Sequence, residues 1–236
     1  MTKTATFAEY AVIHEVQTVP IPKDMPMDRA ALLACGVLTG FGAVVNRAQV
    51  RPSSSVVVIG FGGVGASSVQ AAALSGAYPL IVVDISDDKL KQASLFGATH
   101  TINAKTTDAL AAVLEITSSQ GANYVFVTVG SCDAIKQGLA MCGRRGMTVV
   151  VGLPALDKFV SISPHEFLLG AEKILTGSYL GSSRLRVDVQ NMVRLYQAGL
   201  LKLDEMITRR YRLEQINEAM KSVEKGEALR NVIMFD

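Results

Sequence analysis

A glycine-rich hexapeptide followed at a fixed distance by an acid is the part of this sequence best suited to chemistry. It follows the pattern Gly-x-Gly-x-x-Gly and consists of Gly60, Phe61, Gly62, Gly63, Val64 and Gly65. Apolar runs typical of buried strands flank it at residues 56–59 and 80–83, and Asp84 follows the second run. The order strand, glycine turn, small-residue helix, strand and acid predicts a dinucleotide-binding unit.

Each residue type in this motif has a physical reason. Gly60 permits a tight turn after the strand, Gly62 lets the backbone approach a pyrophosphate, and Gly65 allows the helix and strand to pack closely. The helix N-terminus offers free N–H groups to phosphates, and Asp84 can accept hydrogen bonds from both hydroxyls of the adenosine ribose. An acid here also favours NAD over NADP, because a 2′-phosphate would lie against the carboxylate. The alternative is a glycine-rich turn in an ordinary parallel sheet that binds no ligand.

The surrounding pattern predicts an α/β fold built on a doubly wound parallel sheet, because helices and strands alternate through most of the chain. Further strands are expected at residues 100–102, 124–129, 147–151, 160–162, 173–179, 207–211 and 231–235, with strand-like pieces at 10–13 and 16–19. Helices are expected at residues 27–33, 38–50, 66–74, 87–96, 107–117, 133–141, 166–169, 185–197 and 213–223, with Cys35-Gly36 interrupting the first two. Ligands bind beyond the carboxyl ends of such strands, so the predicted site follows one edge of the sheet.

Composition limits the functional classes. The formal net charge is +2 over 236 residues, which gives no electrostatic footprint for nucleic acid. The uncharged stretch 53–83 is broken by Gln70, Pro79 and small residues into pieces too short for a bilayer, and no signal-peptide region follows Met1, so no membrane is expected. Three irregularly spaced cysteines indicate a reducing, cytoplasmic compartment without a disulfide framework.

These residues also carry a family resemblance that covers essentially the whole chain. The sequence resembles the C-terminal two-thirds of a medium-chain, zinc-type alcohol dehydrogenase, in the class that includes glutathione-dependent formaldehyde dehydrogenases. Beyond the glycine motif, the matching features are Ala34-Cys35-Gly36, Thr39-Gly40, residues 84–89, Phe96-Gly97-Ala98-Thr99, Gly152-Leu153-Pro154 and Arg230.

The resemblance implies roles for individual residues. Cys35 matches a ligand of the catalytic zinc, and Thr39 matches a residue that packs against the nicotinamide of NAD. The glycine motif would hold the pyrophosphate, and Asp84 and Lys89 would hold the adenosine ribose. The remaining matched cofactor contacts are Val129, Gly130, Gly152 and Leu153 beside the nicotinamide half, Ser178, Tyr179 and Leu180 at the carboxamide, and Arg230 at the pyrophosphate.

The resemblance also implies how the chain is organised. Residues 37–179 would form an NAD-binding Rossmann domain, and residues 1–36 and 180–236 would be remnants of a GroES-like catalytic domain. In the family, the strand corresponding to residues 173–179 pairs across a two-fold axis, so a homodimer or higher homo-oligomer is expected.

The sequence departs from the family at the metal. The family's chain begins earlier, in a part that supplies two further zinc ligands, so this chain is expected to be truncated. A catalytic zinc needs three protein ligands, and His14, His100 and His165 do not stand in the Gly-His-Glu setting that the family uses. Taken alone, Cys35 is more typical of a small core residue than of a ligand, and the alternative for Arg230 is a surface cation.

Three functions remain as alternatives. The first is an oxidoreductase that transfers hydride between a small alcohol, or aldehyde adduct, and NAD, with zinc polarising the alcohol oxygen. The second is a catalytically silent NAD-binding module or oligomer partner, which the missing ligands favour for the chain by itself. The third is a zinc-free quinone or enoyl reductase of the same superfamily, against which Cys35 argues.

Overall fold

The computed structural model describes residues 4–235, and the chain divides into two compact units. Unit 1 comprises Met1–Cys35 and Arg184–Asp236, and unit 2 comprises Gly36–Ser183. The sequence placed its domain boundaries after residues 36 and 179. Each unit is described here by itself.

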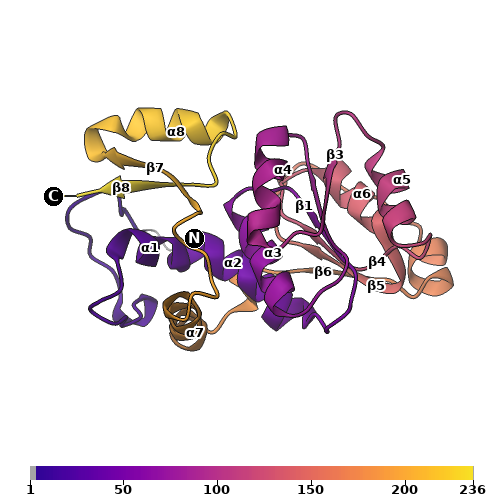
Figure 1. Cartoon of the computed structure of the whole chain (residues 1–236), viewed down its shortest axis with the longest axis horizontal. Coiled ribbons are helices and arrows are strands. Elements are labelled where there is room, and N and C mark those ends of the chain that lie inside the picture. The colour runs from indigo at the N-terminus through magenta and orange to yellow at the C-terminus, as the bar shows by residue number, and fades with distance from the viewer. Residues whose placement is uncertain (1–3, 236) are drawn as a thin grey trace. The chain divides into compact units, whose positions relative to one another are not determined.

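Unit 2 is built on a six-stranded sheet in which every neighbouring pair is parallel (Figure 1). Its strands are β1 (Val56–Ile59), β2 (Leu80–Asp84), β3 (His100–Asn103), β4 (Ala122–Val127), β5 (Cys142–Val150) and β6 (Ile174–Gly177). The order β3-β2-β1-β4-β5-β6 reverses direction between β1 and β4. The predicted doubly wound sheet is therefore confirmed, and its switch point lies where such sheets bind ligands.

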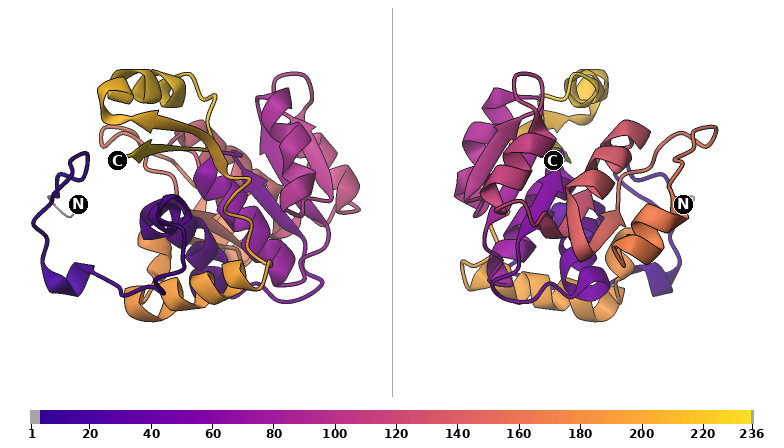
Figure 2. Two further views of the ribbon diagram at one scale, coloured as in Figure 1. Left: turned by 60° about the vertical axis from the view of Figure 1, so that its left-hand side comes forward. Right: turned by 90° about the vertical axis from the view of Figure 1, so that its right-hand side faces the viewer.

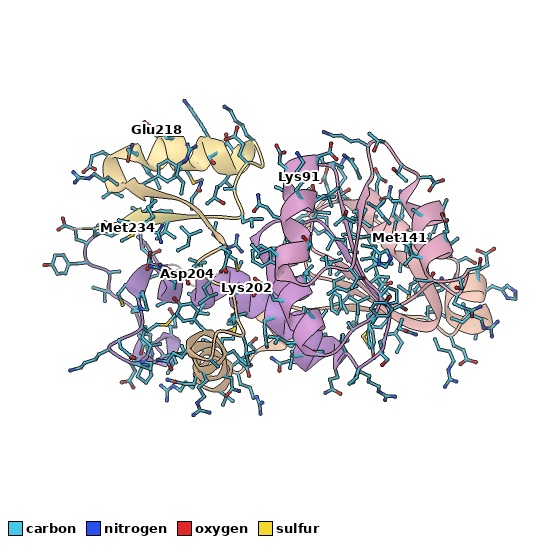
Figure 3. The ribbon with its side chains drawn as sticks, in the orientation of Figure 1. Lys91, Met141, Lys202, Asp204, Glu218 and Met234 are labelled. Atoms are coloured by element: carbon cyan, nitrogen blue, oxygen red, sulfur yellow. The ribbon has the colours of Figure 1, made fainter. Side chains whose placement is uncertain are left out.

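Helices cover both faces of this sheet. They are α2 (Leu38–Gly42), the π-helical η3 (Ala43–Ala48), α3 (Gly63–Leu74), α4 (Asp87–Ala93), η4 (Ser94–Phe96), α5 (Ala109–Ile116), α6 (Cys132–Met141) and η5 (Pro164–Gly170). α3 and α4 lie on one side and α5 and α6 on the other (Figures 1 and 2). The three valines and the isoleucine of β1 are buried, as the uninterrupted apolar run predicts. Met141, labelled in Figure 3, belongs to the core on the α5–α6 side.

The register of the strands brings distant parts of the sequence to one edge. Ile59 lies opposite both Val83 and Val127, Val127 lies opposite Val150, and Val150 lies opposite Gly177. The next residue on each of these strands therefore falls at the carboxyl edge of the sheet. In spatial order these residues are Asp84, Gly60, Thr128, Val151 and Ser178.

Unit 1 contains a small parallel pair of strands joined by a helix. Its elements are η1 (Glu15–Gln17), α1 (Met27–Leu32), α7 (Leu185–Gln197), β7 (Ile207–Arg212), η7 (Leu213–Gln215), α8 (Ile216–Glu224) and β8 (Arg230–Met234). Figure 3 labels Glu218 on α8 and Met234 at the end of β8. The 3-10 turn η6 (Leu180–Ser182) belongs to unit 2.

A buried carboxylate ties the elements of unit 1 together. Asp28 on α1 is 8% exposed and accepts hydrogen bonds from the guanidinium groups of Arg29 and Arg210, the latter on β7. Arg29 also binds Asp204, labelled in Figure 3, with 2.7 Å between Nε and Oδ1. Burial opposes ionisation of Asp28, but the bonds from the two arginines outweigh it, so the pKa of Asp28 lies below its usual value. The network therefore links α1 to β7 and to Asp204 within unit 1.

Several local expectations were wrong. Residues 10–13 and 16–19 form no strand, because they have no sheet to pair with and Tyr10 is 89% exposed. Residues 160–162 likewise form no strand, since strand propensity acts only where a pleated surface can pack. Gly36 does not interrupt the first helices. The π-helical η2 (Leu33–Val37) carries the helix across it, because the apolar residues on either side are buried.

The helical run Met27–Ala48 passes through this region. By length and composition it could cross a membrane, but the buried core helix of a soluble protein meets the same two criteria. Within unit 2 its α2 portion packs closely on α3: a Cβ added at Gly40 would lie 2.2 Å from the carbonyl oxygen of Val64. This is the packing expected of a core helix.

Candidate dinucleotide-binding site

The turn after β1 requires glycine at its first position. Gly60 has a φ of +93°, which lies in the region that side-chain-bearing residues rarely adopt. A Cβ added there would lie 2.4 Å from Cγ1 of Val129. The Gly60 N–H donates to the carbonyl of Val83 at 2.8 Å, so the turn starts where the sheet's hydrogen bonding ends.

The same turn leaves the N-terminus of α3 open. A Cβ on Gly65 would lie 1.9 Å from the carbonyl oxygen of Gly60, so only glycine lets α3 begin this close to the strand. A Cβ on Gly62 would meet no atom within 4 Å, and no side chain caps the first turn of α3. Free N–H groups at an open helix N-terminus, with space in front of them, form a cradle for a phosphate.

Asp84 and Lys89 stand on the neighbouring strand and helix. Asp84 ends β2 and is half-buried, and its carboxylate accepts hydrogen bonds from the backbone N–H groups of Phe61, Ile85 and Ser86. Lys89 lies on α4, also half-buried. The carboxylate thus lies beside the glycine turn, as the spacing predicted.

The loops after β4 and β5 form the other side of the site. A Cβ on Gly130 would lie 2.2 Å from the carbonyl oxygen of Leu153, and one on Gly152 would lie 2.3 Å from the carbonyl carbon of Val129. The two loops therefore pack backbone against backbone. The side chain of Leu153 is 74% exposed and that of Val129 is 37% exposed, so apolar surface is open to a ligand beside the glycine turn.

The three residues after β6 continue the same edge. The Ser178 N–H donates to the carbonyl of Val150 at 3.0 Å, and its side chain is buried. Tyr179 is 75% exposed, and Leu180 has a positive φ of 48°. The structure thus aligns these three residues with the glycine turn, and their contact with a nicotinamide carboxamide stays a prediction.

Thr128 is a positioning residue that the sequence analysis missed. Its hydroxyl lies 2.8 Å from the carbonyl oxygen of Gly60 and 3.0 Å from that of Ile59. It thereby ties the end of β4 to the glycine turn at the switch point of the sheet. Thr128 can be identified only from the register that pairs β1 with β4, and no short sequence motif contains that register.

Cys35, the residue predicted to bind zinc, does not belong to a metal-binding group among residues 4–235. Cys35 is exposed and belongs to unit 1, as does Arg230, whereas Thr39 lies on α2 of unit 2. Burial lowers the pKa of Arg230 below its usual value. No group of three His, Cys, Asp or Glu side chains within residues 4–235 could hold a metal ion. The described residues therefore do not fit a catalytic zinc, and the predicted role of Arg230 stays a prediction.

Comparison with known proteins identifies the family. The family described as zinc-binding dehydrogenase matches residues 63–198, which is more than half of the chain and begins within the glycine motif. The chain belongs to this zinc-binding dehydrogenase family. The resemblance read from the sequence is thereby confirmed.

Relatives match nearly all of the chain. S-(hydroxymethyl)glutathione dehydrogenase of Saccharomyces cerevisiae is 34% identical over 98% of this chain and 61% of its own length. NDMA-dependent alcohol dehydrogenase of Amycolatopsis methanolica is 35% identical over 99% of this chain and 63% of its own. The crystal structure of benzyl alcohol dehydrogenase from Acinetobacter calcoaceticus superimposes with a TM-score of 0.94 at 37% identity, covering 99% of this chain and 64% of that one. This zinc-binding dehydrogenase chain thus spans about three fifths of its relatives' length.

Two glycine substitutions separate folding from binding at this site. Gly65→Ala forces a Cβ against the Gly60 carbonyl, so we expect a loss of about 3 kcal/mol or more in the free energy of unfolding. Gly62→Ala has room in the protein and should change stability by less than about 1 kcal/mol. Its methyl group occupies the space in front of α3, so dinucleotide affinity should fall at least about tenfold. Thermal unfolding and calorimetric titration measure both, and unchanged affinity in Gly62→Ala would place the phosphates elsewhere.

Proposed function

We propose that this chain is the NAD-binding part of a zinc-type alcohol dehydrogenase, which exchanges hydride between NAD and a small alcohol or aldehyde adduct. The observation that carries the proposal is the uncapped N-terminus of α3, with Gly60, Gly62 and Gly65 around it and Asp84 beside it. The names of the relatives, which include a benzyl alcohol and an S-(hydroxymethyl)glutathione dehydrogenase, support the substrate class.

The carboxyl edge has the groups that each part of NAD requires. The N–H groups at the start of α3 would hold the pyrophosphate, and Asp84 with Lys89 would hold the adenosine ribose. The nicotinamide half would lie along the apolar surface of Val129 and Leu153. Bound NAD supplies the hydride acceptor, and the chain's own residues bind and orient it.

A second candidate is a dinucleotide-binding module that performs no chemistry by itself. The observation that favours it is the absence of a three-ligand metal cluster anywhere in residues 4–235. Both candidates share the NAD site and differ in whether this chain turns over an alcohol. The relatives named above are alcohol and S-(hydroxymethyl)glutathione dehydrogenases, which favours the first two candidates over a zinc-free quinone or enoyl reductase.

We expect the chain by itself to bind NAD without oxidising alcohols. Most of the residues proposed to bind NAD lie in unit 2, whereas Cys35 cannot hold a zinc ion in a catalytic geometry without two further ligands. Calorimetry with NAD, followed by dehydrogenase assays on ethanol and on hydroxymethyl thiol adducts across a zinc titration, distinguishes the candidates. Robust zinc-dependent turnover by this chain would contradict the expectation and would show that the chain itself is an active dehydrogenase.

We expect NAD to bind at least about tenfold more tightly than NADP, a difference of about 1.4 kcal/mol. The 2′-phosphate of NADP would add roughly two negative charges beside the Asp84 carboxylate and remove a hydroxyl donor. No arginine follows Asp84 to compensate, because the next residues are Ile85, Ser86 and Asp87. Calorimetric titration of both cofactors measures the preference, and Asp84→Ser should narrow it. Equal affinities in the starting protein would show that the ribose lies elsewhere.

We expect the chain to form homodimers or larger homo-oligomers through β6, one of the two edge strands of the sheet in unit 2. Ile174 is 47% exposed, and the unpaired N–H and C=O groups of β6 can pair with a second copy. Leu175→Lys should shift the protein toward monomer, whereas Leu74→Lys, on an exposed leucine of α3, should not. Light scattering at several concentrations decides, and a strictly monomeric starting protein at tens of micromolar would refute the edge pairing.

A further inference from the structure

The Asp84 carboxylate is already engaged before any ligand arrives. Its Oδ1 accepts the backbone N–H groups of Ile85 at 2.7 Å and Ser86 at 2.9 Å, which is a local turn. Its Oδ2 accepts the N–H of Phe61 at 2.6 Å, and Phe61 lies 23 positions earlier on the glycine turn. One side chain therefore connects the end of β2 to the loop expected to hold the pyrophosphate.

Both the ring and the backbone N–H of Phe61 have partners in the structure. Its ring is fully buried and meets Phe96 edge-on, with 5.7 Å between ring centroids and 65° between planes. Its N–H is the first in the chain after the sheet's hydrogen bonds end, because the Gly60 N–H still donates to Val83. Without a partner, a donor in this position would be left unsatisfied beside a buried side chain. The carboxylate of Asp84 supplies that partner.

We propose that Asp84 is a positioning residue for the glycine turn, in addition to any contact it makes with the ribose. By holding the Phe61 N–H, it keeps the turn and the open N-terminus of α3 in the binding conformation in the free protein. The ribose part of this inference rests on the proposed NAD function, whereas the positioning part concerns the ligand-free chain alone.

Counting acceptor sites sharpens the inference. A carboxylate oxygen has about two lone-pair sites. Oδ1 already accepts two N–H groups and Oδ2 accepts one. One acceptor site therefore remains for a ribose hydroxyl as long as the Phe61 N–H stays bound to Oδ2. The sequence alone assigned both hydroxyls to Asp84. With the Phe61 N–H bound to Asp84, the second ribose hydroxyl would bind to Lys89 on α4 instead.

Hydrogen exchange of backbone amides tests the positioning role without any ligand. In Asp84→Ala, the Phe61 amide should exchange at least about tenfold faster than in the starting protein, because its acceptor is gone. The Gly60 amide, which donates to a backbone carbonyl, should keep its rate and reports on global folding. Asp87→Ala is the matched control, since that nearby carboxylate binds the side chain of Asn103 and not the turn.

A more conservative variant guards against a misfolded protein. Asp84→Asn retains the shape of the side chain with a single, neutral acceptor oxygen, so Phe61 should lose part of its protection while Gly60 retains its own. A Phe61 exchange rate that is the same in all four proteins would overturn the proposal.

A pair of ligands tests the consequence for binding. The probes are ADP and 2′,3′-dideoxy-ADP, which lacks both ribose hydroxyls. If Asp84 acted only on the ribose, Asp84→Ala would leave affinity for the dideoxy ligand unchanged, or would raise it by removing a negative charge near the diphosphate. The positioning role predicts that this affinity falls at least about threefold, because the turn must be ordered on binding.

The two tests can fail separately. If neither probe binds the starting protein, the proposed NAD function fails, and the exchange rates alone decide the role of Asp84. If both probes bind and Asp84→Ala leaves the dideoxy affinity unchanged or raises it, the positioning role is wrong and the NAD function stands.

Discussion

The first turn of α3 lies directly against the backbone of Gly60, and the candidate site depends on this close approach. The fully buried β1 fixes where the turn begins, and the missing side chain of Gly65 lets the helix start there. The N–H groups of the helix therefore face the carboxyl edge of the sheet with space in front of them. Thr128 and Asp84 hold the same turn from the two neighbouring strands, so three strands of the sheet determine one loop.

Much of this arrangement could be predicted from the sequence because it is encoded locally. A strand that is buried on both faces has a continuous run of valine and isoleucine in its sequence, and here a glycine motif of fixed spacing follows it. The ends of such strands then place Asp84, Gly130 and Gly152 along one edge. Thr128, and the bond from the Phe61 N–H to Asp84, could not be predicted, because they depend on how strands far apart in the sequence align. The strands predicted at residues 10–13 and 160–162 are absent for the same reason. Their apolar character suits a strand, but no neighbouring strand pairs with them.

Most residues predicted to bind the cofactor lie in unit 2, whereas the residue matched to a metal ligand lies in unit 1. Apart from Arg230, which lies in unit 1, the groups predicted to bind the pyrophosphate and the adenosine ribose lie in unit 2. The one matched metal ligand, Cys35, ends the first segment of unit 1 and has no two partners among residues 4–235 with which to hold a metal. The chain covers about three fifths of its relatives' length, and binding of the dinucleotide is the function that we propose for its own residues.

The most direct test of this account is an NMR titration of the isotope-labelled chain with NAD. The account predicts that the largest amide shift changes fall on residues 60–65, 84–86, 128–130 and 152–153, which share the carboxyl edge of the sheet. The amino ends of the same strands should be unaffected. Changes centred on the cavity of about 260 Å³ that Lys136, Phe167 and Lys173 help to line, or no changes at all, would contradict it.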